Sequence, residues 1–305
     1  MNEHISIGVI ATDMRQIYMA KMLYLEGYKV RLAYTEGLDR EKLSRIIDDK
    51  ILVSRDITDI IETSDIIVGP VPFQKLGEFI TLPRFETIIS SLKTRFGDDR
   101  TKLKFVYGGV IGEEYASLFD SLNIKYIDFM KIEEIAVFNT IATAEGIIAE
   151  AIINKDTNLH GSECLVLGYG KCAKTLANKL KGIGANVTVA ARKKMDLTTA
   201  SSLGNSTLNI SSLKKHIYGF EYIFNTIPTL ILDERVLSQV NSNALILDIA
   251  SAPGGVDKFT ASKLGLKVIH SLGIPGKYAP ESSGYELAKY LIESIKNISI
   301  HNENM

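Results

Sequence analysis

Several residue types that commonly specialise a protein are scarce in this sequence. The 305 residues include only two cysteines, Cys164 and Cys172, and no tryptophan. Two cysteines cannot build a disulfide framework, and this spacing fits no common zinc pattern, so we expect a reducing compartment and no metal centre. No uninterrupted apolar run exceeds four residues, whereas a membrane span needs about twenty. The first residues lack the basic and apolar parts of a secretory signal, so a cytoplasmic protein that crosses no membrane is expected.

An excess of charge of either sign is also missing. Lys plus Arg total 35 and Asp plus Glu total 36, so no overall field would draw the chain onto nucleic acid or an anionic membrane. Hydrophobic residues make up 46% and charged residues 23%, which is typical of folded domains, and the length predicts two of them. Any site for an anion must therefore be local.

The sequence contains an internal repeat at an offset of 157 residues. Residues Ile7 to Ile10 fall on Cys164 to Leu167, and Gly27 falls on Gly184. Each copy reads as a strand, a turn, a helix with 3.6-residue apolar spacing and a second strand, and each glycine stands where a helix C-terminus takes a positive φ. The copies predict two βαβ units.

Later matches have a smaller offset. Ile124 to Tyr126 falls on Leu266 to Val268 at an offset of 142, which predicts about fourteen extra residues in the first copy, between Gln74 and Lys104. Any two α/β domains share some of these features, so general likeness could also explain the matches. The predicted fold class is the same whether or not the two copies are a true repeat. We predict an α/β protein of two Rossmann-like, doubly wound domains with a cleft between them. The expected division is a substrate domain over 1–138, a nucleotide-binding domain over 139–280, and a helix over 281–305 that returns to the first domain.

Only the second copy carries a phosphate-binding fingerprint, Gly168-Tyr169-Gly170-Lys171-Cys172-Ala173, directly after its first strand. The first glycine permits the tight turn, the second lets the backbone approach a pyrophosphate, and the helix N-terminus faces the anion. A glycine turn kept only for packing is the alternative. The helix N-terminus would also lower the pKa of the Cys172 thiol, although packing is the expected role of that residue.

The end of the next strand predicts which dinucleotide binds. An NAD enzyme usually places Asp or Glu there, but this chain has Arg192-Lys193-Lys194. Cations about twenty residues past the glycines suit a 2′-phosphate, so NADP is favoured over NAD. The alternative is a solvated basic turn with Asp196 as the ribose partner.

The first copy has lost both glycines and reads Ala11-Thr12-Asp13-Met14-Arg15-Gln16 at the same turn. A pyrophosphate would meet the Asp13 carboxylate, so this domain is expected to bind something else. Arg15 and Gln16 could hold a small carboxylate at the helix start. A capping Asp13 with polar surface neighbours explains the same residues.

Further loops should reach the expected cleft. Asn225-Thr226-Ile227-Pro228 and the segment with Ser251 follow strands that would flank a nicotinamide, and Gly109 lies in a turn of the first domain. Structural turns need glycine and proline too. Between the domains, Thr143 is expected to cap a helix over Ile147 to Ile153 and to stand near substrate.

Candidate catalytic side chains are few. Glu145 would lie in the first turn of that helix as the general base, with Asn139 also in reach, although a structural role at the helix start accounts for Glu145. His270 follows a strand near the expected cleft and is a weaker candidate. No metal cluster or nucleophilic triad is present in the sequence pattern.

Together these segments resemble the A-subunit family of dipicolinate synthase from spore-forming bacteria, over nearly the whole chain. The most specific parts are Asp13-x-Arg15-Gln16, Asn139 to Gly146, the Gly168 fingerprint, Asn225 to Pro228, Leu247 to Gly255, and Gly273 to Pro280. The chain departs from the family pattern at Ala11-Thr12, where glycines are usual, at Ala142 in place of proline, and at Ala252 in place of arginine. The loss of that arginine leaves open which cation holds one substrate carboxylate.

The resemblance implies NADP-dependent oxidation of a dihydrodipicolinate, or of its hydrated precursor, to dipicolinate during sporulation. The flavoprotein-like B-subunit of dipicolinate synthase would be the partner, and a homo-oligomer is expected. Arg15 with Gln16 would hold a carboxylate, and Glu145 or water would act as base. Two alternatives stay open: another NAD(P)-dependent dehydrogenase of a small carboxylic acid, and a nucleotide-binding regulatory or scaffold protein.

Overall fold

The computed structural model describes residues 5–96 and 105–303, which form two compact units. Unit 1 contains the chain up to Ala136 together with the C-terminal segment from Pro280, and unit 2 spans Val137–Ala279. Each unit is built around a parallel six-stranded sheet with helices packed on it.

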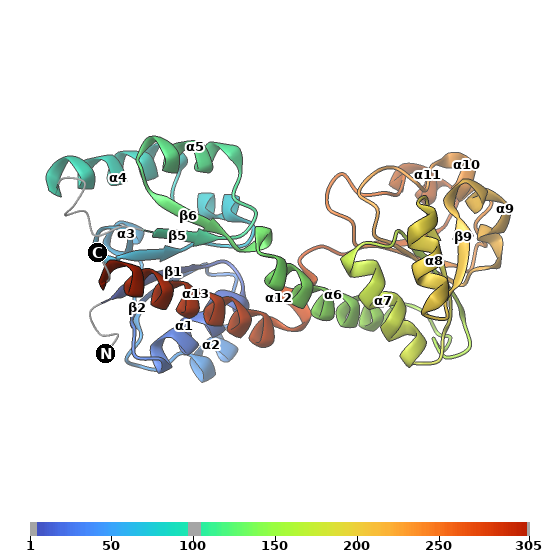
Figure 1. The fold of residues 1–305 in the computed structure, drawn as a ribbon, viewed down its shortest axis with the longest axis horizontal. Coiled ribbons are helices and arrows are strands. Elements are labelled where there is room, and N and C mark those ends of the chain that lie inside the picture. Colours follow the sequence, from blue (N-terminus) through green and yellow to red (C-terminus); the bar gives the residue numbers. More distant parts are fainter. Residues whose placement is uncertain (1–4, 97–104, 304–305) are drawn as a thin grey trace. The chain divides into compact units, whose positions relative to one another are not determined.

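Unit 1 has the strand order β3-β2-β1-β4-β5-β6 (Figure 1). Its strands are β1 (Ser6–Ala11), β2 (Lys29–Tyr34), β3 (Leu52–Val53), β4 (Ile66–Val68), β5 (Phe105–Gly108) and β6 (Lys125–Asp128). Its helices are α1 (Met14–Leu25), α2 (Arg40–Ile46), α3 (Ile57–Thr63), η1 (Phe73–Glu78), α4 (Leu82–Phe96), α5 (Glu113–Ser121), η2 (Phe129–Lys131) and α13 (Pro280–Glu303). Every residue of β1 is buried, as expected for a central strand of a sheet covered on both faces.

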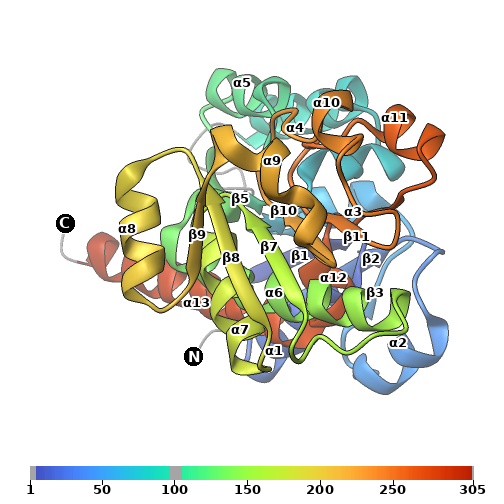
Figure 2. The ribbon, with the colours of Figure 1, turned by 90° about the vertical axis from the view of Figure 1, so that its right-hand side faces the viewer.

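Unit 2 repeats this order as β9-β8-β7-β10-β11-β12 (Figure 2). Its strands are β7 (Glu163–Leu167), β8 (Asn186–Ala191), β9 (Ser206–Asn209), β10 (Tyr222–Asn225), β11 (Leu245–Asp248) and β12 (Lys267–His270). Its helices are α7 (Lys171–Gly182), α8 (Lys194–Ser202), η3 (Ile210–Ser212), α9 (Leu213–His216), η4 (Ile217–Gly219), α10 (Glu234–Leu237), α11 (Lys258–Lys263) and α12 (Ile274–Tyr278), and α6 (Glu133–Asn154) enters it from unit 1. The fold class predicted from the sequence, two Rossmann-like α/β domains, is confirmed.

The internal repeat is also confirmed in detail. Helices α1 and α7, and strands β2 and β8, begin and end at positions 157 residues apart. Gly27 and Gly184 both have φ of +85° after their helices, which explains why each copy needs glycine there. The extra residues of the first copy lie between β4 and β5, where η1 and α4 stand in place of the short α10 of unit 2.

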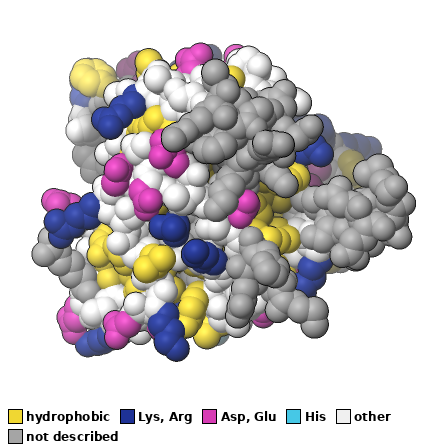
Figure 3. Space-filling model, turned by 90° about the vertical axis from the view of Figure 1, so that its left-hand side faces the viewer, with side chains coloured by type: hydrophobic (Ala, Val, Ile, Leu, Met, Phe, Trp, Pro, Cys, Tyr) yellow, Lys and Arg dark blue, Asp and Glu magenta, His cyan; other side chains and the backbone are white. Residues whose placement is uncertain are grey.

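The C-terminal helix α13 packs along α1 in unit 1 (Figure 1). Leu287, Ala288 and Leu291 are buried in the same apolar cluster as Ile17 of α1. The two helices approach closely at Gly284, where a Cβ would lie 2.3 Å from the Arg15 carbonyl oxygen. The described part of the face in Figure 3 carries both acidic and basic side chains, with apolar ones between them, in keeping with the balanced composition.

The expected helix start at Thr143 is wrong, because α6 runs without interruption over Glu133–Asn154. The Thr143 hydroxyl donates to the Asn139 carbonyl, 2.8 Å away in the preceding turn, so this threonine is satisfied inside the helix. Gly146 does not break the helix either, since the space beside it is filled by Ile274 and Tyr278. Glu145 therefore lies in the middle of a helix, without the N-terminal dipole that was expected to act on it.

Helix α6 is also the one described helix that is long and apolar enough, by length and composition alone, to cross a membrane. Its 18-residue window has a mean hydropathy of 1.5, and 44% of that window is buried within the structure. The helix nevertheless contains no uninterrupted apolar run longer than four residues, because polar residues such as Asn139, Thr143 and Glu145 interrupt it. A buried core helix passes the same test, so this is weak evidence for a membrane span.

Candidate functional site

The turn after β7 has the geometry that the glycine fingerprint predicts. Gly168 has φ of +96°, and a Cβ on it would lie 2.6 Å from Thr226 Oγ1. That hydroxyl donates to the Leu167 carbonyl at 2.8 Å, which fixes the loop after β10 against the turn. Gly168 is therefore required twice, by its backbone conformation and by the close approach of the next loop.

Gly170 is required by neither of these constraints. Its φ is −77°, and a Cβ on it would meet no atom within 4 Å. It is the N-cap of α7, and no side chain caps that helix. Open space at an uncapped helix N-terminus is where dinucleotide-binding folds take the pyrophosphate. Packing does not explain this glycine, whereas room for a phosphate does, so the turn fits a dinucleotide.

The other residues of the fingerprint line the turn. Tyr169 is buried, and the Nζ of Lys174 lies 5.4 Å from its ring centroid. Lys171 is exposed at the first position of α7. The expected lowering of the Cys172 thiol pKa is wrong, because burial raises that pKa more than the nearby Lys171 lowers it. The Cys172 thiol is therefore not activated.

Two fully buried polar side chains hold the loops after β10 and β11. Asn225 Nδ2 donates to Asp248 Oδ1 at 2.8 Å and to the Ile227 carbonyl at 3.1 Å. Asp248 also accepts the backbone N–H groups of Ala250 and Gly255, each at 3.1 Å. The two side chains thus tie both loops to each other at the carboxyl edge of the sheet.

This arrangement brings most of the predicted cofactor residues to one edge of unit 2. The loop after β10 carries Thr226, Ile227 and the exposed Pro228, and the loop after β11 carries the exposed Ser251. β10 is next to β7 in the sheet, and β11 is next to β10. The loops after these two strands therefore lie near the Gly168 turn. Asn225 itself is buried and acts by positioning these loops.

The basic segment stands at the end of β8, on the other side of the Gly168 turn. Arg192, Lys193 and Lys194 are exposed, and their side chains make no hydrogen bond or ion pair within residues 5–96 and 105–303. Lys193 is the N-cap residue of α8, and Asp196 lies in its first turn. Three cations without a described partner thus stand beside the glycine turn, in a chain whose total charge is balanced.

In unit 1 the corresponding turn is closed by its own side chains. Asp13 caps α1, and its carboxylate accepts Arg15 Nε and Nη2, the latter at 2.6 Å. Arg15 Nη2 also donates to the Val71 carbonyl at 3.1 Å. Gln16 completes a capping box by accepting the Asp13 N–H, while its Nε2 is buried without a partner among the described residues. The expected capping role of Asp13 is confirmed, but Arg15 and Gln16 are buried and are not the surface neighbours that this alternative expected. A small carboxylate held by Arg15 and Gln16 stays a prediction.

Gly109 serves packing in unit 1. A Cβ there would lie 2.7 Å from both methyl groups of Val71, so only glycine fits. The next residue, Val110, has φ of +55°, and its N–H is held by Asp128 Oδ1 at 2.9 Å. This loop is built tightly, and Gly109 itself is buried.

The predicted catalytic residues on α6 belong to unit 2 by chain position. Glu145 is exposed and forms an ion pair with Lys179 of α7, with Oε1 and Nζ 2.8 Å apart. Asn139 is half-buried one turn before Thr143. His270 Nδ1 lies 2.7 Å from Lys258 Nζ.

The fold and the open glycine turn define a dehydrogenase-like protein with two Rossmann-like units. The dipicolinate synthase A-subunit of Bacillus subtilis (strain 168) is 31% identical over 242 residues, which cover 76% of this chain and 82% of that protein. The family model for the N-terminal domain of the dipicolinate synthase A-subunit matches residues 6–130. The chain belongs to the A-subunit family of dipicolinate synthase.

Solved structures agree with this assignment. The dipicolinate synthase A-subunit from Bacillus halodurans superposes with a TM-score of 0.81 at 28% identity, covering 96% of this chain and 98% of that one. Its counterpart from Bacillus subtilis gives 0.79 at 27% identity, with 97% of each chain covered. A transhydrogenase from Sinorhizobium meliloti gives 0.66 at 16% identity, over 96% of this chain and 94% of that one, which shows a shared fold alone.

Sequence reasoning missed one buried polar cluster in unit 2. Glu150 of α6 accepts from Ser271 Oγ at 3.1 Å and from Lys277 Nζ at 2.6 Å. The bond from Lys277 holds the pKa of the Glu150 carboxyl below its usual range, against the effect of burial. The only signal in the sequence was a glutamate on the apolar face of a helix, which by itself does not name a partner.

Proposed function

We propose that this chain oxidises a dihydrodipicolinate, or its hydrated precursor, to dipicolinate with NADP as the hydride acceptor. The observation that carries the proposal is the open space at Gly170, beside an uncapped helix and the unpaired cations Arg192 to Lys194. Membership of the A-subunit family of dipicolinate synthase supports the substrate. Dihydrodipicolinate loses one hydride to NADP and one proton, and the hydrated precursor also loses a water molecule; aromatisation of the ring makes the oxidation downhill.

Residues of unit 2 would hold the dinucleotide. The turn from Gly168 to Cys172 would take the pyrophosphate, Arg192 and Lys193 the 2′-phosphate, and the Asn225 to Pro228 and Ser251 loops would border the nicotinamide. When bound, the nicotinamide supplies the hydride acceptor. The fixed Asn225–Asp248 pair keeps these loops in place before any ligand arrives.

The substrate is a dianion, and Arg15 is the proposed carboxylate contact in unit 1. Its Nη1 makes no hydrogen bond to a described residue, while Asp13 and Val71 orient the rest of the guanidinium. Gln16, Gly109 and Thr143 are the further proposed substrate residues; Thr143 is half-buried, whereas Arg15, Gln16 and Gly109 are buried. We propose that Glu145 or water accepts the ring proton, and that Asn139 orients the accepting group.

One assay tests the activity directly. The purified chain is mixed with the precursor and NADP, and the absorbance of dipicolinate is followed together with that of NADPH. Both should rise together with this chain alone. Product that forms only when the B-subunit is added would instead support a nucleotide-binding scaffold, an alternative that the exposed, ion-paired state of Glu145 favours. No product with or without the B-subunit would contradict both.

The double substitution Arg192→Ala with Lys193→Ala should weaken NADP binding by about 30- to 100-fold, because two charge-assisted contacts to the 2′-phosphate are lost. NAD lacks that phosphate, so its affinity should change less than about threefold. Fluorescence titration of the reduced cofactors measures both. Lys214→Ala with Lys215→Ala removes two exposed cations from α9 in the same unit and serves as the control. A tenfold or greater preference of the unaltered protein for NAD would defeat the assignment of NADP.

Glu145→Gln should lower kcat by about 100-fold or more if Glu145 is the base, with little effect on cofactor affinity. Lys179→Met breaks the same ion pair but keeps the carboxylate, so it should retain most turnover. Steady-state kinetics of the two variants separate loss of a base from loss of the ion pair. Full turnover by Glu145→Gln would remove this residue from the role.

The cellular setting is also proposed from family membership. We expect a cytoplasmic protein that acts in sporulation, assembles with the dipicolinate synthase B-subunit, and forms homo-oligomers. The balanced charge of the chain offers no general attraction to nucleic acid or to an anionic membrane, which supports a small dicarboxylate as its ligand.

A further inference from the structure

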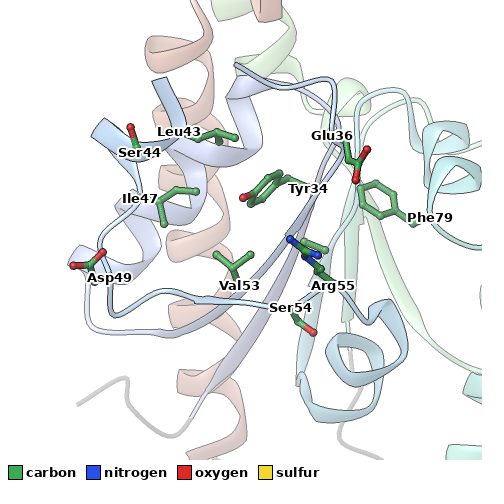
Figure 4. A pocket seen from close by; sticks show the side chains of 11 residues that line it. Tyr34, Glu36, Leu43, Ser44, Ile47, Asp49, Val53, Ser54, Arg55 and Phe79 are labelled. Carbon is green, nitrogen blue, oxygen red and sulfur yellow. The ribbon is translucent and has the colours of Figure 1, made fainter. Parts of the chain in front are cut away.

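A pocket of about 640 Å³ opens in unit 1 where β2 and β3 end (Figure 4). Tyr34 and Glu36 enter it from the end of β2, Arg55 from the segment after β3, and Phe79 from the end of η1. Apolar side chains of the α2 region close its other side. The volume is within the range of pockets that bind small molecules. None of its residues belongs to the site proposed for the dinucleotide or the substrate.

The position of this pocket in the fold indicates the kind of ligand. In doubly wound folds the end of the second strand receives the ribose of a nucleotide, which an acidic residue about twenty positions after the glycine turn binds. Unit 1 has the same strand order as unit 2 and is aligned with it at an offset of 157 residues. At that offset Glu36 occupies the position of Lys193, so unit 1 has an acid where unit 2 has a cation.

Phosphate groups are excluded at this end of unit 1. Asp13 occupies the position of Gly170, and its carboxylate accepts the Arg15 N–H at 2.9 Å. Its own N–H is held by Gln16 at 3.0 Å. The N–H groups of Asp13 and Arg15 are therefore already taken by side chains, so this helix N-terminus has no free donors there for a pyrophosphate. A ligand that reaches the pocket past this turn must do without phosphates.

The lining of the pocket suits an uncharged nucleoside. Tyr34 and Phe79 offer aromatic faces, and the Arg55 side chain has no ion pair among the described residues. In Figure 4 Tyr34 and Arg55 point toward the middle of the pocket, with Glu36 and Phe79 at one side and Asp49 at the other. Two acids against one cation disfavour an anion. Aromatic rings and a guanidinium stack on a purine base, and a carboxylate accepts two ribose hydroxyls.

We propose that unit 1 binds a purine nucleoside without phosphates in this pocket, through stacking on Tyr34, Arg55 and Phe79 and hydrogen bonds to Glu36. The chain would then carry two nucleoside-binding positions, one for the dinucleotide in unit 2 and one in unit 1 that has lost its phosphate turn. The inference does not depend on the reaction proposed above, since it concerns other residues and its test measures no turnover.

The test is calorimetric titration of the full chain with adenosine, AMP and ADP. The titrations are repeated in the Gly170→Asp protein, where the turn of unit 2 is blocked. In the Gly170→Asp protein one adenosine should bind per chain, with AMP and ADP at least about tenfold weaker, and the unaltered protein should bind adenosine at the unit 1 pocket with the same affinity. Glu36→Gln should weaken adenosine by about tenfold or more, because a charged acceptor for the ribose hydroxyls is lost. 2′-Deoxyadenosine should bind the unaltered protein more weakly and lose less on the same substitution.

Glu62→Gln is the matched control, since Glu62 is exposed on α3 in the same unit and does not line the pocket. It should leave adenosine binding unchanged, and circular dichroism should show both variants folded. Three results in the Gly170→Asp protein would overturn the proposal: no adenosine binding at millimolar concentration, binding that a further Glu36→Gln substitution leaves intact, or tighter binding of ADP than of adenosine. A loss confined to the Gly170→Asp protein would place the adenosine in unit 2 and would also overturn it.

Discussion

Gly170→Asp should abolish dinucleotide binding while the protein stays folded. A Cβ at this position meets no atom within 4 Å and the φ of −77° suits any residue, so we expect aspartate to be accommodated, but its carboxylate brings a negative charge to the space proposed for the pyrophosphate. Juxtaposed like charges cost several kcal/mol, so we expect affinity to fall by at least about 100-fold. Stability should rise slightly, by about 0.3 kcal/mol, because Asp is a better N-cap than Gly. Cofactor titration and thermal unfolding measure the two effects.

Unit 1 already has an aspartate at the position that corresponds to Gly170. Asp13 stands at the aligned position of unit 1, caps α1 there, and belongs to a turn that has lost both glycines. Gly219→Asp is the control, because it adds the same charge to unit 2 at an open position before β10, at the opposite edge of the sheet. Gly168→Ala should behave differently from Gly170→Asp. Gly168 has φ of +96° and a Cβ there would lie 2.6 Å from Thr226, so alanine should lower the stability of the protein as well as cofactor binding. Undiminished binding by Gly170→Asp would show that the dinucleotide lies elsewhere.

The elements that sequence patterns predicted best are those whose signals are local and repeated. The βαβ units could be predicted because two copies at one offset show the same strand, helix and glycine, and the structure gives Gly27 and Gly184 the expected positive φ. The glycine turn could be predicted because a phosphate-binding turn needs glycine at both positions, 168 and 170. The fingerprint gives the two glycines different roles, but it does not show which protein atoms surround each of them. One is held by protein contacts and the other faces open space, and only the coordinates show this.

The predictions that were wrong concern residues whose role depends on tertiary contacts. Thr143 looked like a helix cap, yet its hydroxyl finds an acceptor one turn back, and Gly146 is stabilised in the helix by Ile274 and Tyr278 from far along the chain. Cys172 stands at a helix start, where a lowered thiol pKa is usual, but burial outweighs that position. Arg15 was correctly placed at the start of a helix, whereas its ion pair with Asp13 depends on side-chain directions that spacing does not specify.

Asp248→Ala is expected to have the largest effect on stability. The carboxylate is fully buried and accepts three donors, Asn225 Nδ2 and the N–H groups of Ala250 and Gly255. Each buried donor left without an acceptor costs about 1–3 kcal/mol, so we expect a loss of about 3–5 kcal/mol in the free energy of unfolding. Urea unfolding followed by circular dichroism measures it. The chain has no tryptophan, so fluorescence would report only on its 13 tyrosines.

Two further variants separate this network from the general cost of removing an acid. Asp257→Ala removes a carboxylate that caps α11 in the same unit, and it should cost only about 1 kcal/mol. Asp248→Asn keeps the shape and one acceptor, so it should lie between the two. Because Asp248 ties the loop after β11 to the loop after β10, both Asp248 variants should also weaken cofactor binding more than Asp257→Ala does. If Asp248→Ala unfolds within about 1 kcal/mol of the unaltered protein, waters replace the carboxylate, and the loops of the cofactor site do not depend on it.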